Sequence, residues 1–332
     1  MRTSHVNSAV APMGASEWLI LFFLSAVWGG SFFFVEIAID AWPPLTIVAL
    51  RLSGGAIVLW MAALVTGARP PRDIGLWAAI IVMALFNNVL PFSLLAWGQK
   101  EIASGLAAIL NATTPLFTAV LAGAFLPDER MTPSKVAGIA LGVIGVMVMV
   151  GSDIVSHGDN ARMMAILACI AAALSYAVAA IFGRRFAKAG VAPLVTAAGQ
   201  VSAGAILLIL FICVSGYSLD LGAGSGRHWA AAGGLAFLST GLAYGLFFKL
   251  LATSGATNIT LVTILIPVYV IILGVSFLGE RLLSQHIVGL VIIALALVVI
   301  DGRAFRKRDG AKAGCPRITT TGQAGSPPLS GG

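Results

Sequence analysis

The sequence predicts an all-α integral membrane protein with ten transmembrane helices, arranged as an inverted five-plus-five repeat. Three observations lead to this fold class. The chain of 332 residues is 59% hydrophobic and only 10% charged, whereas soluble domains carry about 25% charged residues. Its hydrophobic residues gather in runs long enough to cross a bilayer, and the second half of the chain repeats the first half.

Each hydrophobic run is roughly 18 to 25 residues long, which is the length of helix that crosses a hydrocarbon core of about 30 Å. The runs are too continuous, and too rich in Ala, Leu and Gly, for the alternating pattern of a membrane β-barrel. The ten expected spans cover residues 17–39, 44–66, 74–98, 102–126, 133–151, 162–183, 193–215, 228–250, 255–278 and 284–301.

The repeat is marked by residues that recur at a nearly constant spacing. Pro115 recurs as Pro267 after 152 residues, and Glu129 recurs as Glu280 after 151 residues. Because each copy holds five spans, an odd number, the second copy enters the membrane from the opposite side. Inverted repeats with proline-bearing helices at matching places are typical of secondary transporters.

The chain is therefore expected to have four parts. They are a cytoplasmic N-terminal segment (1–16), a first repeat with spans one to five (17–151), a second repeat with spans six to ten (162–302) and a cytoplasmic tail (303–332). The tail begins with basic residues and continues with Gly, Ser, Thr and Pro. This composition cannot offset the entropy lost on ordering, so we predict that the tail is disordered.

The positive charges predict the orientation and argue against nucleic-acid binding. The net charge is +7, but the Lys and Arg residues do not form a patch on a polar domain. With a cytoplasmic N-terminus, fifteen of the twenty Lys and Arg residues lie inside, four lie outside and Arg51 lies within a span. The positive-inside rule then predicts that both termini are cytoplasmic.

Two polar pairs at matching places in the repeats are candidates for substrate binding. Asn87 and Asn88 lie midway along the third span, and Ser239 and Thr240 take the corresponding places in the eighth. Polar side chains are costly at bilayer depth, so each needs a partner or a function. Together with Tyr244, one turn further on, they offer donors and acceptors to a solute. The alternative is hydrogen bonding between helices.

The prolines of the fourth and ninth spans are predicted to act in gating. A proline removes a backbone donor and frees a carbonyl one turn upstream. Near Pro115, such a carbonyl and the side chain of Asn111 can bind a substrate ammonium group. Bending at Pro115 and Pro267 would open and close the path. The alternative is a static kink whose free carbonyls are satisfied by Thr hydroxyls.

Four further side chains within the spans are candidates. Trp28 in the first span, and Tyr176 at nearly the same place in the sixth, can stack on an apolar or aromatic solute or pack between helices. Arg51 can bind a substrate carboxylate, or it can have a structural role on backbone carbonyls. Glu36 is the only carboxylate placed for proton coupling, unless it lies at the lipid edge or in a loop.

The spans lack the residues that an enzyme or a channel needs. An enzyme requires a paired acid, a cluster of histidines or a nucleophile beside a base. All four histidines lie at or beyond span ends, and the three cysteines do not have metal-ligand spacing. We therefore predict no catalytic residue, no metal and no cofactor. The sequence also shows neither a ring of charged residues nor a filter motif, which a selective channel would need.

Several motifs follow one another in a fixed order, and one of them is repeated in the second copy. They are Trp28-Gly29-Gly30-Ser31, Leu50-Arg51, Ala103-Ser104-Gly105-Leu106, Phe125-Leu126-Pro127-Asp128-Glu129-Arg130 and, in the second copy, Phe277-Leu278-Gly279-Glu280-Arg281. Over residues 17–302 this order resembles the EamA-type repeat of the drug/metabolite transporter superfamily. One departure is that Pro127-Asp128 stands where that family usually has Gly, which leaves the geometry of this first loop open.

The resemblance implies a bacterial inner-membrane protein with a central cavity, lined mainly by spans one, three, four, six, eight and nine. It implies the export or exchange of small metabolites by alternating access. We expect amino acids, including neutral and aromatic ones, and a monomer or homodimer in the lipid bilayer. The alternatives are a channel and a carrier of nucleotide-sugars or phosphorylated sugars. Those multiply charged substrates need several basic residues at mid-depth, where the sequence offers only Arg51.

Overall fold

The computed structural model describes residues 13–127, 129, 131–157, 160–217 and 221–301. The expected tail 303–332 and most of the expected segment 1–16 lie outside these residues. Within the described ranges the secondary structure is helical throughout. The α-helices of the first repeat are α1 (Ala15–Ile39), α2 (Pro44–Val65), α3 (Ile74–Ala84), α4 (Leu90–Gly98), α5 (Ser104–Asn111), α6 (Thr114–Phe125) and α7 (Pro133–His157).

The second repeat contains five α-helices, and three π-helical segments continue or join helices of both repeats. The α-helices are α8 (Asn160–Lys188), α9 (Pro193–Ser215), α10 (Gly226–Gly233), α11 (Ala243–Leu273) and α12 (Ser284–Asp301). The π-helical segments are η1 (Leu85–Val89), η3 (Gly234–Leu242) and η4 (Gly274–Leu278), and a short 3₁₀ helix, η2, covers Leu221–Ala223.

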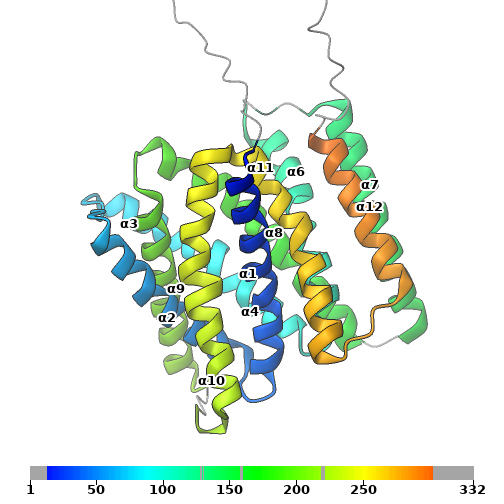
Figure 1. Ribbon diagram of the computed structural model, residues 1–332, viewed down its shortest axis with the longest axis horizontal. Coiled ribbons are helices and arrows are strands. Elements are labelled where there is room, and N and C mark those ends of the chain that lie inside the picture. Colours follow the sequence, from blue (N-terminus) through cyan, green and yellow to red (C-terminus); the bar gives the residue numbers. More distant parts are fainter. Residues whose placement is uncertain (1–12, 128, 130, 158–159, 218–220, 302–332) are drawn as a thin grey trace, which may run out of the picture.

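These helices form ten spans in the described part of the chain. Nine are long and apolar enough to cross a membrane, and the tenth, Ser284–Ile300, is apolar but slightly shorter. The predicted all-α fold of two five-span repeats is thus confirmed. The largest difference lies between the eighth and ninth spans, where the helical hydrogen bonding of α11 continues without a break. Figure 1 shows α11 turning over at the top of the bundle between these two spans.

Successive spans run in alternating directions between two ends of the bundle (Figure 1). We call the end at which α1 begins and α12 ends the termini end, which is uppermost in Figure 1, and the other the opposite end. The first repeat begins with α1 at the termini end, whereas the second begins with α8 at the opposite end. The two repeats are therefore inverted with respect to each other.

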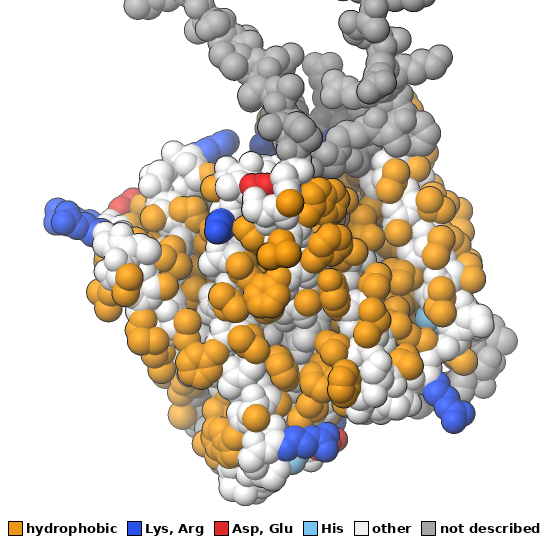
Figure 2. All heavy atoms as spheres, viewed as in Figure 1, with side chains coloured by type: hydrophobic (Ala, Val, Ile, Leu, Met, Phe, Trp, Pro, Cys, Tyr) orange, Lys and Arg blue, Asp and Glu red, His pale blue; other side chains and the backbone are white. Residues whose placement is uncertain are grey.

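The outer surface has the polarity of a membrane-spanning bundle. In Figure 2, hydrophobic side chains cover the sides of the bundle, and Lys, Arg, Asp and Glu lie toward its two ends. Large apolar residues such as Leu64, Val65 and Val214 are between 77% and 88% exposed. A surface of this kind is stable in contact with lipid and would be costly in contact with water.

The glycines of α7 and α12 allow these two helices to approach closely. A Cβ atom on Gly138 would lie 2.8 Å from the carbonyl oxygen of Ala296, and one on Gly289 would lie 2.9 Å from the carbonyl oxygen of Gly145. Small residues let the backbones of membrane helices come together and gain van der Waals contact. Gly138 and Gly145 are therefore used inside one molecule, between the fifth and the tenth span.

Candidate functional site

A cavity of about 520 Å³ lies between the two repeats. Its volume falls in the range of roughly 300–1,000 Å³ that is usual for sites of small ligands. The predicted residues that line it are Trp28, Arg51, Asn87, Asn111, Tyr176, Ser239 and Tyr244. The predicted residues outside its lining are Glu36, Asn88, Pro115, Thr240 and Pro267. The cavity thus receives side chains from both repeats.

The cavity reaches the surface at the termini end and is closed at the opposite end. Ala187 and Pro193, which line it next to the connection between α8 and α9, are exposed. Figure 1 shows this connection at the termini end. Toward the opposite end, the lining residues Val35, Ala96 and Gln99 are at most 7% exposed. A solute can therefore enter from one end only in this conformation.

The two predicted polar pairs lie on the π-helical segments η1 and η3. Asn87 and Asn88 belong to η1, and Ser239 and Thr240 belong to η3. In each pair the first residue lines the cavity, whereas the second is completely buried behind it. Because π-helical turns are uncommon and concentrate at functional sites, their recurrence at matching places supports a role for this region.

The π-helical segments were not predicted from the sequence, although Pro91 gave one signal. Proline has no N–H group, so it cannot make the α-helical hydrogen bond to the carbonyl of Asn87. The N–H of Leu90 instead donates to the carbonyl of Leu85, five residues earlier. The wider turn that results lets Asn87 face the cavity.

Three amide side chains converge on the hydroxyl of Tyr244. Its oxygen lies 3.3 Å from Asn87 Nδ2, 3.4 Å from Gln200 Nε2 and 3.5 Å from Asn88 Nδ2. Asn87 Nδ2 also donates to Gln200 Oε1 at 3.1 Å. A phenolic oxygen accepts at its lone pairs and carries one hydrogen that it can donate. With amide donors on the oxygen, this hydrogen is available to an acceptor on a bound solute.

Arg51 brings a positive charge to the cavity. Its Nε donates to Thr240 Oγ1 at 3.2 Å, and Thr240 in turn donates to the carbonyl of Leu235 at 2.9 Å. The guanidinium carbon lies 3.7 Å from the ring centroid of Phe92, a cation–π contact. Among the described residues, the ion pairs found do not include Arg51. Thr240 therefore holds the guanidinium in place from behind, and a negative partner is left for a solute to supply.

Aromatic rings form much of the remaining wall. The rings of Trp28 and Phe247 have centroids 5.6 Å apart, and those of Tyr244 and Phe248 are 5.9 Å apart. Ser239 also lines this wall and donates to the carbonyl of Val27 at 3.1 Å. Rings in these tilted arrangements offer a large apolar surface to a ligand. The cavity therefore combines one cation, several amides and an aromatic wall.

The fourth span is interrupted between Asn111, the last residue of α5, and Pro115 in the first turn of α6. At this break the hydroxyls of Thr113 and Thr114 donate hydrogen bonds to the carbonyls of Leu110 and Asn111, at 2.6 and 2.7 Å. Those carbonyls are thus already bonded within the protein. The side-chain Oδ1 of Asn111 is buried without a hydrogen-bond partner, and it is the acceptor left for a solute.

Pro267 and Glu36 have different surroundings from those expected. Pro267 lies inside the continuous helix α11, so it does not mark a break like the one at Pro115. Glu36 Oε2 accepts a hydrogen bond from Gln99 Nε2 at 3.0 Å. Gln99, which lines the cavity, also donates to the carbonyl of Phe32 at 2.9 Å. Glu36 is therefore linked to the cavity by a hydrogen bond to one lining residue, Gln99.

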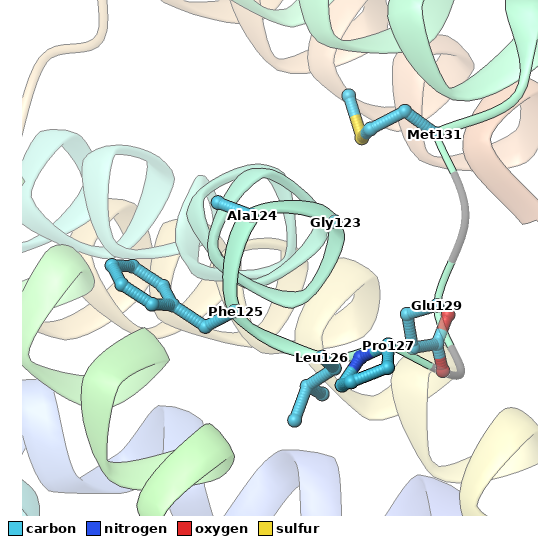
Figure 3. A pocket seen from close by; sticks show the side chains of 7 residues that line it. All are labelled: Gly123, Ala124, Phe125, Leu126, Pro127, Glu129 and Met131. Atoms are coloured by element: carbon cyan, nitrogen blue, oxygen red, sulfur yellow. The ribbon is translucent and has the colours of Figure 1, made fainter.

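A second, open hollow of about 400 Å³ lies at the end of α6, away from this cavity. Figure 3 shows its lining residues: the side chain of Met131 points toward Gly123 on α6, and Leu126, Pro127 and Glu129 lie on the other side of the space. It has neither the aromatic wall nor the converging amides of the central cavity. In the part of the chain that the structure describes, His, Cys, Asp and Glu do not form a cluster that could hold a metal ion.

Ten spans in two inverted repeats around a polar and aromatic cavity define a membrane carrier fold. The chain belongs to the EamA-like transporter family, whose model matches residues 16–151 and again residues 163–301. The resemblance inferred from the motifs is thus confirmed, and the protein is a multi-pass membrane transporter of a family that does not consist of enzymes.

Two relatives and one solved structure illustrate this kinship. The chain is 26% identical over 284 residues to the uncharacterized inner membrane transporter YedA of Escherichia coli strain K12, covering 84% of this chain and 89% of that protein. It is 26% identical over 308 residues to a probable amino-acid metabolite efflux pump of the same strain, covering 89% and 98%. A crystal structure with 23% sequence identity has a TM-score of 0.63 over 88% of this chain and 99% of its own, which shows the shared fold.

Proposed function

We propose that this protein is a bacterial inner-membrane carrier that exports or exchanges small amphipathic metabolites, chiefly amino acids, by alternating access. The observation that carries the proposal is Arg51, a buried cation on the cavity wall whose hydrogen bond and ring contact are both to neutral groups. A buried charge without a counter-charge is costly, and a substrate carboxylate would offset that cost.

The other lining groups suit the rest of an amino acid. The hydroxyl of Tyr244 donates a second hydrogen bond to the carboxylate. Oδ1 of Asn111, which is buried and without a partner, accepts one from the ammonium group. An apolar or aromatic side chain packs against Trp28 and Phe247, whose rings form one wall. These contacts favour neutral and aromatic amino acids.

A carrier of nucleotide-sugars or phosphorylated sugars is the weaker alternative. Such substrates bring two or more negative charges, and phosphate groups in proteins are usually held by several Arg or Lys side chains. Among the described residues that line the cavity, Arg51 is the single basic one. One guanidinium matches one carboxylate and leaves a phosphate dianion uncompensated.

The proposed orientation places the termini end in the cytoplasm, as the positive-inside rule predicts. The conformation described here then faces inward, so an amino acid made in the cell can enter the cavity and leave on the other side. The proposed chain has an N-terminal segment (1–16), two repeats (17–151 and 162–302) and a tail (303–332), with the segment and the tail in the cytoplasm. A relative named as an amino-acid metabolite efflux pump supports this direction of transport.

The test is counterflow in proteoliposomes that contain the purified protein. Vesicles preloaded with an unlabelled neutral or aromatic amino acid are expected to take up the labelled one transiently and with saturation. Preloading with a sugar phosphate serves as the control and is expected to have no effect. A conductance that rises linearly with the gradient, without counterflow, would indicate a channel. Counterflow of the sugar phosphate alone would support the rival carrier.

The same vesicles test coupling to protons. An exporter exchanges the amino acid for a proton, so an outward proton gradient, with the vesicle interior acidic, is expected to drive accumulation of the amino acid by the wild-type protein. The Glu36→Gln variant is expected to lose this accumulation and keep counterflow, because exchange of two substrate molecules needs no net proton movement. Accumulation that is equal in both proteins would remove Glu36 from the proposed coupling.

A further inference from the structure

The opposite end of the bundle is held shut by a contact between the two repeats. The carboxylate of Glu280, from the loop before α12, accepts hydrogen bonds from the backbone N–H groups of Ser104 at 2.8 Å and Gly105 at 3.2 Å. These are the first N–H groups of α5, which have no partners within their own helix. A carboxylate is well suited to this place, because the N-terminus of a helix carries a partial positive charge.

The surroundings of Glu280 fit this contact closely. A Cβ atom on Gly274 would lie 2.5 Å from Glu280 Oε2, so a larger residue would displace the carboxylate. Gly279 has a φ of +68°, a left-handed conformation that favours glycine and turns the chain toward α5. The side chain of Leu282 covers Gly105, where a Cβ atom would lie 3.2 Å from it. We call Glu280 and Leu282, together with Leu278 at the end of η4, the seat of α5.

This contact also bears on the substrate site. Helix α5 is only eight residues long, and Asn111 at its far end lines the cavity. Glu280 is therefore bonded to the start of the same short helix that supplies a cavity residue at its end.

At the termini end, the equivalent residues of the first repeat have different contacts. The repeat equivalents of the seat are Leu126, Glu129 and Met131, by the spacings of 152 and 151 residues. These three residues line the open hollow of Figure 3. Here Glu129 forms an ion pair with Lys135 at 2.8 Å on its own repeat, instead of holding the start of a helix.

The segment that would fill this hollow is also present in the sequence. Ala103-Ser104-Gly105, where α5 begins, has the counterpart Thr253-Ser254-Gly255 in the second repeat, matched by its Ser-Gly pair at a spacing of 150 residues, two fewer than at the prolines. In this conformation the helical hydrogen bonding of α11 runs through Ser254 and Gly255, so their N–H groups belong to a continuous helix. They can bind a carboxylate only if α11 breaks before Ser254.

We propose that Glu280 and Glu129 are reciprocal positioning residues of transport, each of which holds one end of the path closed in one of two conformations. In the alternate conformation Glu280 releases α5, α11 breaks before Ser254, and the new helix start fills the hollow at Glu129. The termini end is then closed and the opposite end open. This inference rests on the proposed carrier function, but its test requires no substrate.

The test measures access to the cavity from the opposite end. Cys169, Cys213 and Cys315 are replaced by Ala, and Val35→Cys is introduced as a reporter, because Val35 lines the cavity and is only 7% exposed. A membrane-impermeant maleimide is applied to vesicles from each face. Leu221→Cys, exposed at the opposite end, is the control that identifies this face and reports folded, inserted protein.

Loss of Glu280 and loss of Glu129 are expected to change the labelling rate of the reporter at position 35 in opposite directions. Glu280→Ala removes two hydrogen bonds and should raise the rate at which the reporter at position 35 is labelled from the opposite end by at least about tenfold, the factor for losing one hydrogen bond to a charged acceptor. Glu129→Ala should lower that rate, because it destabilises the alternate conformation, in which the cavity is open at the opposite end. Glu280→Gln, which keeps one acceptor oxygen, should give an intermediate rate.

Three results would overturn the proposal. They are equal reporter labelling with and without Glu280, a change of the same sign in the Glu280 and Glu129 variants, and a rise in Leu221→Cys labelling that matches the rise at the reporter. If Glu280→Ala fails to insert, as the control would show, Glu280→Gln decides the question by itself. A failure of amino-acid counterflow would refute the proposed substrate while leaving this labelling result unaffected.

Discussion

At the scale of single residues, the charge of Arg51 governs what the central cavity can bind. The cost of burying a guanidinium is partly offset by the ring of Phe92 and the hydroxyl of Thr240. Both are neutral, so the site keeps a net positive potential toward a solute. The planar guanidinium can also bind a carboxylate through two parallel hydrogen bonds, which a lysine cannot do.

Replacement of Arg51 by the residue at the equivalent position of the other repeat gives the first prediction. Arg51→Gln should raise the KM for an amino acid by about tenfold or more, because hydrogen bonds to charged groups contribute roughly 1.5–3 kcal/mol. The matching amino-acid amide, which lacks a carboxylate, is the control and should show little change. An equal loss for acid and amide would mean that Arg51 has only a structural role.

At the scale of elements, hydrophobic run lengths were enough to predict the spans, because the bilayer itself sets how long an apolar helix must be. The π-helical segments could not be predicted in this way. One inserted residue leaves the hydropathy of η1 and η3 unchanged, but it decides which member of each polar pair faces the cavity. This is why Asn88 and Thr240 were expected beside a substrate and instead lie behind Tyr244 and Arg51.

The α7–α12 pair provides a prediction about stability. Gly138→Ala should lower the thermal stability in detergent, since overpacking of this kind costs about 1–3 kcal/mol. Gly245→Ala is the matched control, because a Cβ there meets open space and alanine favours helix. It should be neutral or slightly stabilising. Equal behaviour of the two variants would mean that α7 and α12 do not pack as described.

The two prolines provide a prediction about rate. Alanine at position 115 or at position 267 should slow turnover roughly fivefold, because each restored backbone donor can add a hydrogen bond of about 1 kcal/mol that must break when the helix bends. The double variant should be slowed roughly thirtyfold. Substrate affinity should change little. Binding measured by calorimetry and turnover measured by counterflow separate the two effects. An unchanged turnover in the double variant would exclude hinges at these positions.

At the scale of the whole molecule, the number of spans determines where the chain ends lie. Because α1 begins and α12 ends at the same end of the bundle (Figure 1), both termini should face one compartment. A fluorescent protein fused to either terminus should fluoresce in the cytoplasm, and alkaline phosphatase inserted after Leu221 should be active outside. The reverse pattern would contradict the charge-based orientation while leaving the fold intact.

The candidate site could be predicted only in part, because it forms only when distant parts of the chain come together. Polar residues at bilayer depth are conspicuous in a sequence, so Asn87, Asn111 and Tyr244 could be selected without a structure. The partners that converge on them come from distant spans. Gln200 and the seat at Glu280 are separated from their contacts by 113 and 176 residues in the chain. No local pattern specifies such contacts.

The difference in charge between Arg51 and Gln200 has a consequence for how a ligand is oriented. These residues hold equivalent places in the two repeats, and both line the cavity. If the halves were identical, an amino acid could lie in two opposed poses of equal energy, related by the pseudo-two-fold axis. A cation on one side and a neutral amide on the other make the poses unequal. The proposed amino-acid substrate is then expected to bind with a fixed polarity, its carboxylate toward α2.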